Sequence, residues 1–179
     1  MTLPRRYTYA DYLQLPDDQR CEILGGELVM TPSPSGRHQT VISTIHATLW
    51  HFARGAGLGK VMVAPYDVVL SEQDVVQPDI LFLSNVRLGL YDDNGPLHGA
   101  PDLVIEVLSP STAQRDRVAK RALYARSGVL SYWLVDLDDK TITVITFPDD
   151  TERTYRSGET LTDPVLPGFA IPLDDLLQS

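Results

Sequence analysis

The sequence predicts an α/β fold, in which a central mixed β-sheet is flanked by helices and preceded by an N-terminal β-hairpin. Two observations support this class. Runs rich in β-branched residues recur through the middle of the chain, and a stretch with helical spacing separates two of these runs. A strand, a helix and a strand within one sheet favour a right-handed crossover, with the helix packed on the sheet.

The first thirty residues predict a short helix and the hairpin. Thr8 can cap a helix over YADYLQL, residues 9–15, which Pro16 ends. CEILGGELVM, residues 21–30, has the pattern of two short strands turned by its two adjacent glycines.

A long helix is expected next. TPSPSG, residues 31–36, reads as a loop, and apolar residues recur at helical spacing from Val41 to Phe52. The glycines at positions 55 and 57 end this helix.

Three apolar runs then predict successive strands. They are KVMVAPYDVVL (60–70), VVQPDILFLS (75–84) and PDLVIEVLS (101–109), and a polar, Gly-rich loop over residues 85–100 separates the last two. SPST offers hydroxyl caps for a helix over residues 113–128, which ends near Gly128. LSYWLVDLDDKTITVITF, residues 130–147, reads as two strands joined by an Asp-Asp-Lys turn.

Length and composition indicate one domain over residues 1–179. With 43% hydrophobic and 22% charged residues, the chain is neither disordered nor fibrous. One cysteine excludes an intrachain disulfide, and no apolar run approaches the roughly 20 residues of a membrane span. The first residues resemble no export signal, so we expect a cytoplasmic protein without a membrane partner.

The formal charge of −9 argues against a surface that is basic throughout. Residues 128–179 carry ten acids and three bases, whereas residues 110–127 carry five bases and one acid. The predicted helix at 113–128 is therefore expected to form a local basic patch.

Two acids stand where burial disfavours them. Glu106 lies inside LVIEVL, and Asp79 follows Pro78 at the start of DILFL. A buried carboxylate goes neutral or finds a cation, a metal ion or several hydrogen bonds. Acids from adjacent strands can share a hard ion such as Mg²⁺. The simpler alternative is that each acid pairs with an arginine or with backbone amides, or lies at an exposed strand end.

Two further residues are candidates for the same site. Glu22, in the first strand of the hairpin, could add a third acid, although a glutamate on an edge strand is more often solvated. Asp116, Lys120 and Tyr124 share one stripe of the predicted helix, so Lys120 could reach the carboxylates. The alternative for Lys120 is an ordinary surface pair with Asp116.

Arg37 and His38, at the start of the long helix, could meet a phosphate together with helix N–H groups. A plain helix-start histidine is the alternative reading. None of the four histidines has zinc-site spacing, and no motif for a nucleotide-binding loop or a serine hydrolase is present.

Five segments spread along the chain carry a resemblance to a known family: CEILGGELVM, PSPSGRHQ, QPDI, GAPDLVIEVLSPST and RDRVAKRALYARSGVLSYWLVD. Together they resemble the putative restriction endonuclease family, expanded in cyanobacteria, within the PD-(D/E)-x-K nuclease superfamily. The resemblance covers nearly the whole chain. It implies a restriction-endonuclease-like fold, a site that uses Mg²⁺ or Mn²⁺, and DNA as the substrate.

Carried over to this sequence, the resemblance assigns roles to individual residues. Asp79 and Glu106 resemble the metal-binding acids, the carbonyl of Val107 a further ligand, and Glu22 the additional acid. The usual lysine two residues after the second acid is missing, because that position is Leu108. Lys120 resembles a relocated lysine that takes its place.

The resulting hypothesis is a metal-dependent DNA endonuclease in which Lys120 positions the attacking water. Arginines of the same helix, Arg117 and Arg121, would hold the DNA backbone, and a homodimer would let two sites engage two strands. Two alternatives stay open: a catalytically silent binding or assembly module with the nuclease fold, and a phosphoesterase that acts on a small molecule.

Overall fold

A six-stranded mixed sheet forms the centre of the computed structural model, which describes residues 5–16 and 19–177. In chain order its strands are β3 (Gly59–Val63), β6 (Ile80–Ser84), β8 (Leu103–Val107), β9 (Ser131–Asp136), β10 (Thr141–Thr146) and β11 (Thr151–Tyr155). Across the sheet the order is β11-β10-β9-β8-β6-β3, and only β8 and β9 are parallel to each other. The expected lack of an export signal concerns the first residues, of which 1–4 lie outside the described residues.

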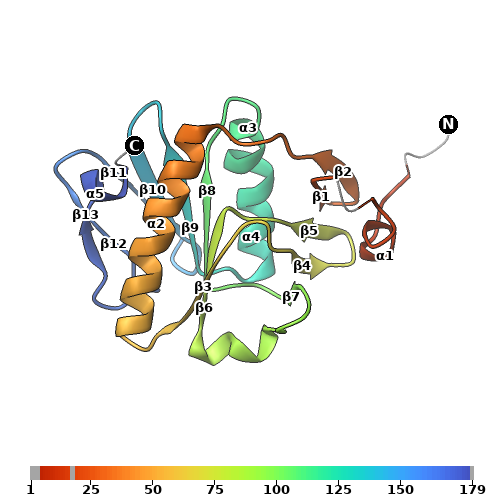
Figure 1. Ribbon diagram of the computed structural model, residues 1–179, viewed down its shortest axis with the longest axis horizontal. Helices are drawn as coiled ribbons and strands as arrows, with labels where there is room; N and C mark the ends of the chain where they lie inside the picture. Colours follow the sequence, from red (N-terminus) through yellow and green to blue (C-terminus); the bar gives the residue numbers. More distant parts are fainter. Residues whose placement is uncertain (1–4, 17–18, 178–179) are drawn as a thin grey trace.

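Helices cover both faces of this sheet, as Figure 1 shows around β8. The long helix α2 (Gly36–Gly55) lies on one face. The other face carries the connection from β8 to β9, made of α3 (Ala113–Arg115), the π-helical turn η2 (Asp116–Lys120) and α4 (Arg121–Ser127). A helical connection between two parallel strands of one sheet, and a mixed sheet flanked by helices, are therefore confirmed.

Strand β8 shows how the two faces are assigned. Leu103, Ile105 and Val107 belong to the core beneath α2, whereas Val104 packs in the core beneath α4. Successive side chains of a strand point to opposite faces, so Glu106 points to the α4 face.

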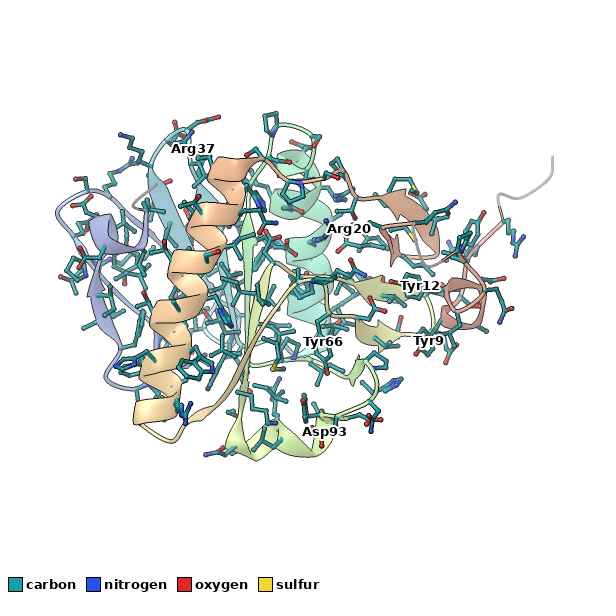
Figure 2. All side chains as sticks on the ribbon, in the orientation of Figure 1. Tyr9, Tyr12, Arg20, Arg37, Tyr66 and Asp93 are labelled. Carbon is teal, nitrogen blue, oxygen red and sulfur yellow. The ribbon has the colours of Figure 1, made fainter. Side chains whose placement is uncertain are left out.

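A second sheet has the order β2-β1-β5-β4-β7. Its strands are β1 (Cys21–Leu24), β2 (Glu27–Met30), β4 (Val68–Ser71), β5 (Asp74–Val76) and β7 (Leu97–His98). β1 and β2 form the predicted N-terminal hairpin, and Gly25 and Gly26 both have positive φ in its turn. Helix α1 (Tyr9–Tyr12) packs on this sheet through Tyr9 and Tyr12, which Figure 2 labels.

Two predicted strands were wrong in extent. The run 60–70 is divided between β3 and β4, and the run 75–84 between β5 and β6, so each contributes to both sheets. Pro65 and Pro78 stand at the two breaks, and proline has no N–H with which to continue a ladder. The predicted loop over 85–100 also contains a 3₁₀ helix, η1 (Asn85–Leu90), and β7.

The C-terminal segment packs on the core beneath α2. It contains β12 (Thr160–Thr162), β13 (Ala170–Pro172) and α5 (Leu173–Leu176). Leu161, Phe169 and Leu173 are buried in the same cluster as Ile45 and Leu49 of α2. Among the described helices, none combines the length and the apolar character that crossing a membrane requires.

Candidate active site

A cavity of about 560 Å³ lies where the parallel strands β8 and β9 end. Its walls come from β1, the first turn of α2, the end of β8 and the helix that follows it. The four residues expected to be catalytic all line this cavity: Glu22, Asp79, Glu106 and Lys120. Arg20, beside the hairpin, and Arg37, at the start of α2, line it as well, and both are labelled in Figure 2.

The ammonium of Lys120 is the centre of a buried cluster. Its Nζ lies 2.8 Å from Oε1 of Glu22 and 2.8 Å from Oε1 of Glu106. The exposed fractions of Glu22, Glu106 and Lys120 are 1%, 4% and 3%. Charges at this depth are held by their mutual attraction and hydrogen bonds.

Two more residues of the same helical segment contact the cluster. Oδ1 of Asp116 lies 3.8 Å from Nζ of Lys120, and the hydroxyl of Tyr124 donates a 2.8 Å hydrogen bond to Oε1 of Glu106. The stripe predicted for Asp116, Lys120 and Tyr124 therefore faces the site. The alternative of a surface pair is wrong, because Asp116 and Lys120 are both buried.

The cluster brings three carboxyl groups to one ammonium. Burial raises the pKa of Glu106 well above its ordinary value, although the nearby Lys120 opposes this shift. Burial likewise raises the pKa of Asp116. The pKa of Lys120 is also raised, because Glu106, Glu22 and Asp116 outweigh the effect of burial. Lys120 therefore stays charged, while the surrounding carboxylates favour additional positive charge.

Asp79 lies next to Glu106 on the neighbouring strand. The antiparallel register pairs Ile80 of β6 with Ile105 of β8, which brings the residue before Ile80 opposite the residue after Ile105. Oδ2 of Asp79 accepts a 2.7 Å hydrogen bond from the N–H of Val107. Asp79 thus sits at the start of β6, where the sequence placed it.

His38 reaches the same point from α2. Its Nε2 lies 2.9 Å from the carbonyl oxygen of Val107 and 3.5 Å from Oδ2 of Asp79. Burial lowers the pKa of His38, but the Asp79 carboxylate and the Val107 carbonyl raise it by more, so that the net change is upward.

Glu22 is not a solvated residue of an edge strand. β1 lies between β2 and β5, so Glu22 is buried inside the second sheet. The backbone N–H of Gln77 donates a 2.8 Å hydrogen bond to its Oε1. The Gln77 side chain is fixed by hydrogen bonds to Asp67 and to the hydroxyl of Tyr12.

The donor atoms suit a hard divalent cation. Asp79, Glu106 and the Val107 carbonyl offer oxygen, the ligand that Mg²⁺ prefers while it keeps several waters. Oε2 of Glu22 and Oδ1 of Asp116 are buried without a hydrogen-bond partner. Within residues 5–16 and 19–177, however, no three His, Cys, Asp or Glu side chains converge as a complete ligand set. A cation here would need the backbone carbonyl and water to complete its shell.

The expected basic patch is largely neutralised. Arg117 pairs with Asp136 at 2.7 Å and Arg121 with Glu152 at 2.8 Å, and neither arginine lines the cavity. Arg37 does line the cavity, but it binds Asp138 and the carbonyl of Leu137.

Two arginines that the sequence analysis did not select as site residues lie at the cavity. Arg20 and Arg115 line the cavity, and the Nε of each is buried without a hydrogen-bond partner among the described residues. Arg115 directly precedes Asp116 and Arg20 lies two positions before Glu22, and this closeness in sequence to site residues was the available signal.

Comparison with known proteins identifies the family and the fold. A family model described as "Putative restriction endonuclease" matches residues 9–174. The fold is similar to the crystal structure of a putative nuclease belonging to DUF820 from Anabaena variabilis, with a TM-score of 0.81 and 21% identity over 95% of this chain and 97% of that one. A search of curated proteins found no match. The chain belongs to the family of putative restriction endonucleases.

Proposed function

We propose that this protein is a divalent-cation-dependent endonuclease that hydrolyses phosphodiester bonds of DNA in the cavity at the ends of β8 and β9. Asp79, Glu106 and the carbonyl of Val107 would hold Mg²⁺ or Mn²⁺. Lys120 would position the attacking water, and Glu22 would orient Lys120. Family membership supports the nuclease class, and the arrangement of charges supports the assignment of roles.

The observation that carries the proposal is the position of Lys120. Its ammonium lies 2.8 Å from carboxylates on two different sheets, Glu22 on β1 and Glu106 on β8. A surface-pairing lysine needs no such burial. The position two residues after Glu106, where the superfamily usually has its lysine, is Leu108, which carries no charge. Lys120 brings an ammonium to Glu106 from a helix instead.

The residues of the chain divide the work among them. A cation held there would lower the pKa of the attacking water and draw charge from the phosphate. Lys120 would fix that water by a hydrogen bond and balance negative charge that grows on phosphorus. Arg20 and Arg115, whose Nε groups lack partners, would bind the phosphates on either side of the scissile bond.

The number of sites that act together determines the product. A monomer carries one copy of the candidate site and would nick one strand at a time. A homodimer would present two cavities related by a two-fold axis and could cut both strands. Supercoiled plasmid distinguishes the two, because nicking yields open circles and double cleavage yields linear DNA.

The test is cleavage of supercoiled plasmid by the full chain with Mg²⁺, with Mn²⁺ and with EDTA. We expect cleavage only with a cation, and a loss of at least about a hundredfold in Asp79→Asn, Glu106→Gln and Lys120→Ala, because each removes a ligand or the water-positioning group. Glu152→Gln is the matched control, since it removes a carboxylate on β11, outside the cavity.

Other outcomes contradict the proposal in distinct ways. Equal cleavage by all variants would place the activity elsewhere or in a contaminant. Cation-independent DNA binding without cleavage would indicate a silent binding module. Hydrolysis of bis(4-nitrophenyl) phosphate with no action on plasmid would indicate a phosphoesterase for small molecules.

A further inference from the structure

His38 stands apart from the other polar residues at the start of α2. The Arg37 side chain turns to Asp138 and Leu137, which also line the cavity. The His38 imidazole instead turns inward, with a side chain that is mostly buried, and its Nε2 meets the Val107 carbonyl and the Asp79 carboxylate. These two oxygens are ligands in the function proposed above.

The distances from Nε2 of His38 to these two oxygens are close to those between neighbouring ligands of a single ion. Ligands about 2.1 Å from an octahedral cation and at right angles to each other are about 3 Å apart. Nε2 of His38 lies 2.9 Å from the Val107 oxygen and 3.5 Å from Oδ2 of Asp79. Nε2 therefore lies at close to the spacing of a neighbouring ligand from each of the two oxygens.

The surroundings of the ring agree with this role. Nδ1 of His38 is buried and makes no hydrogen bond to the described residues. A cation at this point would replace the hydrogen bond between Nε2 and the Val107 carbonyl. The ring proton would then reside on Nδ1, which has no other contact to lose, and the lone pair of Nε2 would face the cation. Helix α2 fixes the backbone from which the ring reaches, since Ser35 caps it at the N–H of His38.

We propose that His38 is a ligand of the divalent cation, through Nε2, beside Asp79 and the carbonyl of Val107. The inference rests on the function proposed above and gives the site a specificity. Mg²⁺ favours an all-oxygen shell, whereas first-row transition ions accept imidazole readily. His38 thus shifts the preference of the site from Mg²⁺ toward ions such as Mn²⁺. A phosphate contact, the role expected from the sequence, would leave metal affinity independent of His38.

The experiment measures metal binding without DNA. The full chain is titrated at fixed pH with MnCl₂ and, separately, MgCl₂ by calorimetry, as wild type, His38→Ala, His38→Gln and Asp79→Asn. We expect His38→Ala to weaken Mn²⁺ binding about tenfold or more and Mg²⁺ binding much less. His51→Ala is the matched control, because it removes an exposed histidine of the same helix outside the cavity.

A spectroscopic measurement on the wild type does not depend on any variant folding. Electron spin echo modulation of bound Mn²⁺ should show coupling to an imidazole ¹⁴N, and His38→Gln should lose it. If Mn²⁺ binds and Asp79→Asn weakens its binding, but the wild type shows no nitrogen coupling or His38→Ala keeps the wild-type affinity, then His38 is not a ligand. The proposed function would not be affected by that result. If the wild type binds no Mn²⁺, both this inference and the proposed function are wrong.

Discussion

At the scale of single residues, Lys120 is tied to the fold as well as to the chemistry. Its ammonium is buried among three carboxylates, Glu22, Glu106 and Asp116. Removing one partner from a buried ion cluster leaves uncompensated charge, which costs about 3–5 kcal/mol. The stability of the protein and its proposed activity therefore depend on the same side chain.

Lys120→Met should destabilise the protein by about 3–5 kcal/mol near neutral pH. The loss should depend on pH in a definite direction. The folded-state pKa values of Glu106 and Asp116 are raised by burial, and without the ammonium they rise further. When the pKa of a carboxyl group is higher in the folded than in the unfolded state, the folded protein is more stable at low pH, where the group is protonated. This contribution to stability is lost as the pH rises through the folded-state pKa.

Urea unfolding of wild type and Lys120→Met at about pH 5 and about pH 8 measures this effect. The difference in free energy of unfolding should be small at the lower pH and large at the higher one. Lys60→Met, which removes an exposed lysine of β3, is the control and should change little at either pH. A difference that is equal at both pH values would mean that the carboxylates do not cause the loss.

At the scale of elements, the N-terminal cap of α2 also positions a residue of the candidate site. Ser35 Oγ accepts the N–H of His38 at 3.3 Å, so the residue that begins the helix also fixes the backbone of a site residue. Ser35→Ala should lower the free energy of unfolding by about 1 kcal/mol. It should also weaken Mn²⁺ binding, because the first turn of α2 then frays and His38 with it.

Thermal unfolding with and without MnCl₂ tests this prediction. Ser43→Ala makes the same chemical change further along α2, where Ser43 Oγ donates to the carbonyl of Gln39 at 2.9 Å. The control should keep wild-type stabilisation by Mn²⁺. If both variants lose it equally, the cap has no special connection to the site.

Other elements show where local sequence patterns are reliable. Periodicity placed Asp116, Lys120 and Tyr124 on one stripe, and the structure turns that stripe to Glu106. The π-helical turn at 116–120 was not predictable, because it changes hydrogen bonding without a distinctive residue pattern. The split strands were within reach, since Pro65 and Pro78 mark both breaks.

At the scale of the whole molecule, the site depends on contacts that no local pattern contains. Glu22 meets Lys120 across 98 positions of sequence because the second sheet folds against the α4 side of the first. Its burial was missed, since a hairpin read alone has two edge strands and only β5 makes β1 an inner strand. Ion pairs between distant segments, such as Arg121 with Glu152, likewise neutralised the basic patch expected from composition.

The net charge of −9 opposes the long-range attraction of DNA to this protein. Long-range attraction is weak for such a protein, so binding should depend on a cation in the cavity and on a few arginines there. We expect fluorescence anisotropy of a labelled duplex, at constant ionic strength, to show binding about tenfold tighter with Ca²⁺ than with EDTA, because the dication offsets the buried carboxylates.

The salt dependence of DNA binding should be shallow. Arg115→Ala should reduce the slope of log K against log salt by about one, whereas Arg121→Ala, which removes a paired residue outside the cavity, should leave it unchanged. Tight binding in EDTA with a steep slope that falls in Arg121→Ala would place the DNA on the outer face of the helix instead of at the cavity.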